Sequence, residues 1–159
     1  MSRYIIAIIS VLVLSCVKRE RSIPDNFDSQ KTSAEIRMML DAYHADMTRE
    51  GLMAEFKYLD STDTFFWVPP GYQSTLDYDS VRAILEANAR TYRSVAFSWD
   101  TLQIFPLSNT IATYSGIVNG EMTDTAEQKT QVSIIESGTI IKRTDGWKLL
   151  CGQSAVLPE

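Results

Sequence analysis

Residues 128–156 read QKTQVSIIESGTIIKRTDGWKLLCGQSAV, and this segment predicts two long β-strands joined by a tight turn. Apolar and polar residues alternate along it, which is typical of a strand with one buried face. Asp145-Gly146 is a strong hairpin signal, and Gly138 predicts a bulge or bend within the first strand. We therefore expect strands over residues 128–143 and 147–156.

The chain before this hairpin has the same period of two. Val95, Phe97 and Trp99 alternate with small or polar residues, and residues 102–105 continue this predicted strand up to a turn at 106–109. Another strand is expected over residues 110–119, closed by the turn signal Asn119-Gly120. Consecutive strands joined by short turns predict an antiparallel meander.

Helical periodicity marks the first part of the domain. Thr32 and Glu35 have the spacing of a capping box, an apolar stripe follows as far as Met47, and Gly51 can end the helix. A second short helix is expected over residues 52–58.

A short strand and a third helix follow in the pattern. Residues 63–68 are rich in aromatics and are stopped by Pro69-Pro70-Gly71. Asp79 or Ser80 can cap the third helix. Its inner stripe consists of Val81, Ile84, Leu85, Asn88 and Tyr92.

This order of elements predicts an α+β fold, because helices that precede a meander pack on one face of its sheet. A long sheet that bends at a bulge curls around those helices. We expect a curved antiparallel sheet wrapped on three N-terminal helices. Such a cone-shaped roll leaves a cavity between its concave face and the helices.

The same order, together with the ending IKRTDGWKLL at residues 141–150, resembles the nuclear transport factor 2-like superfamily and, within it, the SnoaL-like group. The resemblance spans residues 32–159 and implies a cone-shaped, cystatin-like roll. It also implies that a homodimer can form through the outer face of the sheet. The superfamily includes isomerases, dehydratases, hydrolases and transport adaptors, so the fold alone does not choose a function.

The C-terminal strand departs from the pattern of many SnoaL-like relatives, which carry two histidines after the tryptophan at steps of four and six. Here those positions are Cys151 and Gln153. Strand alternation puts both on the face of Trp147 and Leu149, which the resemblance implies is concave. Two groups that titrate near neutral pH are thus replaced by a thiol and an amide.

Two residues are candidates for acid–base chemistry. His44 lies on the apolar stripe of the first helix, where it is either a buried core imidazole or a base facing the cavity. Glu136 lies on the more apolar face of its strand, and enclosure would raise its pKa and favour proton transfer. A register slip across the bulge would instead turn Glu136 to solvent.

Aromatic side chains suggest what the cavity could bind. If they are not ordinary core residues, they form a flat apolar lining with a few polar tips, suited to an aromatic or lipid-like molecule. These pocket candidates are Tyr43, Trp67, Tyr92, Trp99 and Tyr114, with Cys151 and Gln153 beside them.

The N-terminus predicts the location. Arg3 precedes an apolar run at residues 4–14 that is too short for a membrane span of about 20 residues. Val-Leu-Ser-Cys at 13–16 resembles a bacterial lipobox, which implies a signal peptide at residues 1–15 and lipidation of Cys16. Residues 16–31 are polar and predict a tether, and residues 32–159 form the domain. The expected location is the bacterial cell envelope, lipid-anchored and facing the periplasm or the exterior. A secreted protein or an uncleaved signal anchor are the alternatives.

The composition of the chain indicates which partners and cofactors are not expected. The chain of 159 residues has a formal net charge of −5, and removal of residues 1–15 takes away one arginine and no acid, which leaves −6. An acidic chain without basic clusters is a poor match for nucleic acid. One histidine and two cysteines do not predict a metal site, and no cofactor motif is present, so we expect neither.

Three functions are considered for this chain. The first hypothesis is binding of a small apolar molecule at the membrane. The second is a lyase or isomerase that uses His44 or Glu136, and the third is a dimeric interaction module.

Overall fold

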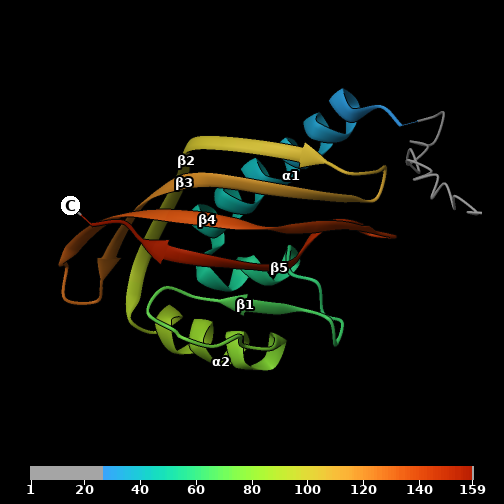
Figure 1. Cartoon of the computed structure of the whole chain (residues 1–159). Helices are drawn as coiled ribbons and strands as arrows, with labels where there is room; N and C mark the ends of the chain where they lie inside the picture. Colours follow the sequence, from blue (N-terminus) through green and yellow to red (C-terminus); the bar gives the residue numbers. More distant parts are fainter. Residues whose placement is uncertain (1–26, 159) are drawn as a thin grey trace, which may run out of the picture.

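The computed structural model describes residues 27–158 and has the expected α+β architecture (Figure 1). The elements in chain order are α1 (Ser29–Glu50), the 3-10 helix η1 (Leu52–Lys57), β1 (Phe66–Val68), α2 (Tyr78–Ala89), β2 (Tyr92–Pro106), β3 (Ile111–Asp124), β4 (Lys129–Arg143) and β5 (Gly146–Val156).

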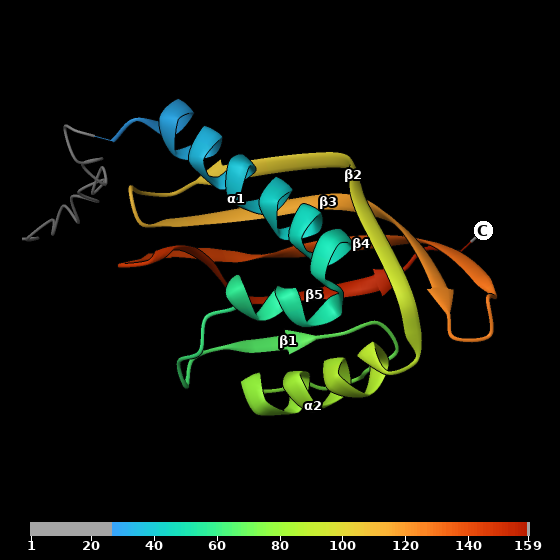
Figure 2. The ribbon, with the colours of Figure 1, turned by 180° about the vertical axis from the view of Figure 1, so that it is seen from behind.

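The five strands form one curved sheet in the order β1-β5-β4-β3-β2. Strands β2 to β5 are the predicted antiparallel meander, whereas β1 pairs with β5 in parallel. Figure 2 shows α1 and η1 lying across one face of the sheet, with α2 next to the β1 edge. The helices therefore cover the concave face.

Shifts in the pairing register bend the sheet. The pairing of β2 with β3 shifts between Trp99 and Thr101, and the pairing of β4 with β5 shifts between Thr139 and Ile140. Because Thr139 pairs with Cys151 and Ile140 with Leu149, Leu150 is the extra residue of a bulge on β5. The predicted break at Gly138 is thus one residue from the observed one, and the inserted residue lies on the partner strand. A bulge of this kind increases local twist and bending.

The helix starts differ from the prediction. Asp28, not Thr32, caps α1: its carboxylate accepts a hydrogen bond from the backbone N–H of Lys31 at 2.9 Å. Thr32 is buried within the first turns, and Glu35 instead accepts hydrogen bonds from Lys142 and Trp147. Residues 29–31, which we expected in the tether, are therefore helical. The cap of α2 is likewise Asp77, earlier than predicted.

Strand β3 continues through the predicted turn at Asn119-Gly120. Gly120 pairs with Phe97 on β2 and Val132 on β4, and a side chain at this position would meet the Phe97 ring at 2.8 Å. Glycine at this position therefore makes room for an aromatic ring. The reversal comes later, where the side chain of Asp124 accepts hydrogen bonds from the backbone of Ala126 and Gln128.

The hydrophobic core fills the space between α1 and the concave face at the end of the cone near the β4–β5 hairpin. Its most buried members are Ile36 and Leu40 from α1, Ile140 from β4 and Leu149 from β5. An ion pair closes this end: the side chain of Asp60, only 2% exposed, binds Arg143 at 2.6 Å. The packed core leaves the other half of the cone free for a cavity.

Candidate functional site

A cavity of about 340 Å³ lies between the concave face of the sheet, α1, η1 and α2. Most of its walls are aliphatic or aromatic. They include the predicted inner stripe of α2 and the start of β2, namely Val81, Ile84, Leu85, Asn88 and Tyr92. A largely apolar cavity with a few polar groups is the usual form of a small-molecule site.

Glu136 is in the wall of this cavity, on β4. Its neighbours at alternate positions, Val132 and Ile134, line the same cavity, as strand alternation requires. The hydroxyl of the buried Tyr114 on β3 donates a hydrogen bond to Glu136 Oε1 at 2.6 Å. Burial raises the pKa of Glu136 to about 7, although the tyrosine hydrogen bond opposes this rise.

A second carboxyl, that of Glu55, also lines the cavity. Burial is the main cause that raises its pKa to about 8, and the negative charge of Glu136 raises it further. A side-chain hydrogen bond with Tyr43 acts in the opposite direction. Burial also raises the pKa of Tyr43 well above its usual value. The cavity thus contains two electrostatically coupled carboxyls, each hydrogen-bonded to a buried tyrosine.

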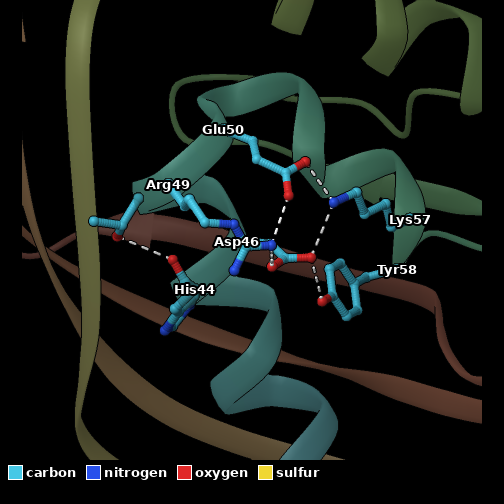
Figure 3. A network of polar contacts seen from close by, with 7 residues as sticks. His44, Asp46, Arg49, Glu50, Lys57 and Tyr58 are labelled. Carbon is cyan, nitrogen blue, oxygen red and sulfur yellow. Dashed lines mark hydrogen bonds and ion pairs between the residues drawn. The ribbon is translucent and has the colours of Figure 1, made fainter.

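A polar network fixes the segment that carries Glu55 (Figure 3). Asp46 of α1 accepts hydrogen bonds from Lys57 at 3.1 Å and from the hydroxyl of Tyr58 at 2.9 Å. Arg49 pairs with Asp46 and Glu50, and Lys57 also pairs with Glu50. The end of α1 is therefore tied to the end of η1, which holds η1 in the orientation that directs Glu55 inward.

His44 is 5% exposed and also lines the cavity. Its ring stacks on Trp99 at 4.8 Å between centroids and lies 5.1 Å from the ring of Tyr43. Burial lowers its pKa to about 4, so the imidazole is neutral at physiological pH. Its Nδ1 has no hydrogen-bond partner among the described residues. The structure thus brings His44 and Glu136 to one cavity without a hydrogen bond between them.

The aromatic candidates divide into two groups. Tyr43, Trp67 and Tyr92 line the cavity. Trp99 and Tyr114 do not line it and stand behind the wall, where their rings contact each other edge to face at 6.0 Å. Trp99 stacks on the ring of His44, and Tyr114 donates a hydrogen bond to Glu136.

The structure corrects the orientation expected for Cys151 and Gln153. Both lie on the convex face, in a shallow groove with Phe66 and Val68, and neither lines the cavity. The cause is the bulge at Leu150, which shifts the alternation of β5 by one residue, so that Ser154 and Val156 face inward instead. Cys151 therefore has no contact with His44 through the cavity.

The convex face of the sheet carries several exposed apolar side chains. Ile135, next to the inward Ile134, is 44% exposed, and Phe66, Phe105 and Ile111 are exposed on other strands of the same face. The homodimer that the resemblance implied through this face stays a prediction.

Residues 27–158 provide neither a ligand set for a metal ion nor a membrane-spanning helix. No group of three or more His, Cys, Asp or Glu side chains in this range is arranged to hold a metal ion. Within the same residues, no helix combines the length and apolar character needed to cross a bilayer. Cys16 and the predicted signal peptide lie outside the described residues.

Sequence reasoning missed Glu55. It lies in LMAEFK, where the apolar residues predict a helical stripe to which the glutamate does not belong. The inward turn results from the 3-10 geometry of η1, which places residues three apart above one another. Glu55 follows the buried Leu52 by three residues, and that spacing was the available signal.

No family model matches the sequence, and no curated protein matches it, so the known likeness is structural. A nuclear transport factor 2-like superfamily protein from Salmonella enterica serovar Typhimurium has a TM-score of 0.71 at 10% identity, over 83% of this chain and 95% of that chain. A candidate scytalone dehydratase from Novosphingobium aromaticivorans has a TM-score of 0.70 at 14% identity, over 81% and 89%. A Caulobacter vibrioides protein with a cystatin-like fold has a TM-score of 0.63 at 10% identity, over 80% and 91%.

The helices enclosed by a curved sheet and the cavity in the open half of the cone define the class as a cystatin-like α+β roll. More specifically, the chain has the nuclear transport factor 2-like fold. The resemblance inferred from residues 141–150 is thereby confirmed for the fold.

Proposed function

We propose that this protein binds a small, mainly apolar or aromatic molecule in the cavity between the sheet and the helices. The observation that carries the proposal is the combination of a largely apolar cavity of about 340 Å³ with a few polar groups in its wall, among them Glu55, Glu136 and His44. An apolar wall supplies affinity by burying the ligand, and a few fixed polar groups orient it.

Two adjacent isoleucines allow a matched test. Ile134 lines the cavity, whereas Ile135 is exposed on the convex face. We expect Ile134→Trp to weaken binding of Nile red, a neutral apolar dye, by about tenfold or more because the indole occupies ligand space. Ile135→Trp adds the same bulk outside the cavity and should leave the affinity within about twofold of the wild type.

Fluorescence titration of the dye gives the dissociation constants, and circular dichroism verifies that both variants are folded. Equal affinities for the two variants would show that the dye binds elsewhere and would count against the cavity as the site. Native mass spectrometry of protein purified from its own host would then identify the natural ligand.

Acid–base catalysis on the bound molecule is the second candidate function, as a lyase or isomerase. It is favoured by one observation: the pKa values of Glu136 and Glu55 are raised to about 7 and about 8, the range in which a carboxyl can take up and return a proton. His44 is a weaker candidate base, because burial lowers its pKa. Recovery of a chemically changed ligand would separate catalysis from binding.

We also propose that the mature protein is anchored to the bacterial cell envelope through a lipid on Cys16, with the cavity domain outside the cytoplasm. The support is the arrangement of Arg3, the apolar run at 4–14 and the cysteine that follows Ser15. Two or more acyl chains anchor a protein stably, whereas one gives only reversible binding.

Replacement of the lipidated cysteine tests this location. We expect Cys16→Ala to move most of the protein from the membrane fraction to the soluble fraction, because it removes the acylated side chain. Cys151→Ala is the matched control, since Cys151 lies in the folded domain, and it should leave the protein at the membrane. Immunoblots of fractionated cells measure the distribution, and membrane retention of Cys16→Ala would contradict lipid anchoring.

A further inference from the structure

Building on the proposed ligand-binding function, we infer that the cavity selects ligands with a protonated amine attached to an apolar or aromatic body. Glu55, Glu136 and the ring of His44 form the acceptor set for the ammonium group.

The ionisable side chains of the cavity wall include acidic groups but no lysine or arginine. Glu55 on η1 and Glu136 on β4 both line it, and no lysine or arginine is among the described residues that do so. The basic groups nearest in sequence to Glu55 are engaged elsewhere: Lys57 binds Asp46 and Glu50 in the network at the end of α1 (Figure 3). Both carboxyls therefore receive hydrogen bonds from tyrosines, and neither forms an ion pair with a basic side chain of residues 27–158.

His44 is a second feature of the cavity wall that suits an ammonium group. His44 is 5% exposed, lines the same cavity and has an Nδ1 without a hydrogen-bond partner among the described residues. The imidazole is neutral, so one of its ring nitrogens accepts a hydrogen bond and does not repel a cation.

An ammonium group matches the acceptors of the cavity. An ammonium group has three N–H donors, and the cavity offers two carboxyls and one imidazole as acceptors. Burying a carboxylate without a counter-charge is costly, and a bound cation removes that cost by pairing with it. The aromatic walls formed by Tyr43, Trp67 and Tyr92 add surface that attracts cations as well as apolar groups.

The set does not match other ligand charges. A carboxylate ligand would add a third acidic group beside Glu55 and Glu136 and would raise the free-energy cost of ionising any of the three. A metal ion would require a denser group of ligating side chains than the described residues provide. A neutral alcohol could hydrogen-bond to one acceptor but would not stabilise the ionised form of either carboxyl.

Three ligands of the same shape test the inference: 2-naphthylmethylamine, 2-naphthylmethanol and 2-naphthoate, titrated into the full chain by isothermal calorimetry at pH 7. We expect the amine to bind about tenfold or more tightly than the alcohol and the naphthoate to bind most weakly. Amine binding should also release protons, because pairing lowers the pKa of the carboxyls, and buffers of different ionisation enthalpy detect this release.

The double variant E55Q/E136Q keeps the volume of both side chains and should bring the amine and the alcohol within about threefold of each other. Glu121→Gln, at an exposed position of β3 that does not line the cavity, is the control and should keep the preference. If the alcohol binds the wild type as tightly as the amine, the inference is overturned and the proposed binding function stands. If Nile red and all three naphthalenes fail to bind, the proposed function itself fails.

Discussion

The free energy of unfolding is expected to fall by about 2 kcal/mol or more as the pH rises from 6.5 to about 9, because two buried carboxyls must then ionise. In the folded state the pKa values of Glu136 and Glu55 are raised to about 7 and about 8, whereas an unfolded glutamate titrates near 4.5. Between those values the folded protein binds more protons than the unfolded chain. The unfolding free energy must therefore decrease with pH throughout this range.

The pKa values of the other buried groups determine the pH range in which the two glutamates can be observed alone. His44 has the opposite effect below pH 6.5, because burial lowers its pKa to about 4 and the unfolded chain takes up its proton first. The pKa of Asp60 is lowered, so its contribution is lost only under acidic conditions. The pKa values of Tyr43 and Tyr114 are raised and matter only above the window. From pH 6.5 to 9 the two glutamates alone dominate.

Urea denaturation at several pH values measures this slope. The double variant E55Q/E136Q should show a nearly flat profile in this window and should exceed the wild type in stability at pH 9. Glu121→Gln removes an exposed carboxyl and should retain the wild-type slope. A wild-type stability that is constant from pH 6.5 to 9 would mean that the two carboxyls are solvated in the folded protein.

Gly152→Val is expected to lower the free energy of unfolding by about 3 kcal/mol, because this position has no room for a side chain. A Cβ atom at Gly152 would lie 2.5 Å from the backbone oxygen of Ser137 on β4 and 2.6 Å from the ring of Trp67. Gly152 pairs with Gly138 on one side and with Trp67 on the other. A side chain there would have to separate β5 from a backbone neighbour that cannot rotate away.

Chemical denaturation compares this variant with Ala155→Val, which adds bulk to an exposed position of the same strand. We expect the control to change stability by less than about 0.5 kcal/mol. Because the indole of Trp67 lines the cavity, Gly152→Val should also weaken Nile red binding. A Gly152→Val protein as stable as the Ala155→Val control would contradict the close packing of Trp67 on β5.

Local patterns predicted most elements of the fold. The apolar stripe of α1 was readable because a helix repeats every 3.6 residues, and Asp145-Gly146 specified the last hairpin because few residues adopt its turn. Gly51 ends α1 as predicted, with a positive φ of 88°. Alternation along β4 left Glu136 facing either the cavity or solvent, and the structure has it in the cavity wall.

The errors arose where a choice depends on contacts distant in sequence. The extra residue at Leu150 is defined by the pairing of β5 with β4, and one such residue exchanged the faces assigned to Cys151 and Gln153. Asp28 and Thr32 are both good helix caps, and burial of Thr32 against the rest of the domain selected Asp28. The network around Asp46 fixes η1 and thereby Glu55, and the only local signal for this was the three-residue spacing of Glu55 from Leu52.

Titration of the glutamate side-chain carboxyl carbons by ¹³C nuclear magnetic resonance tests most directly whether two carboxyls face a cavity that excludes water. Two resonances, assigned with Glu55→Gln and Glu136→Gln, should titrate with midpoints near 8 and 7, well above the remaining glutamates. If every glutamate carboxyl titrates below about pH 5, both carboxyls are solvated and the proposed acceptor set does not exist.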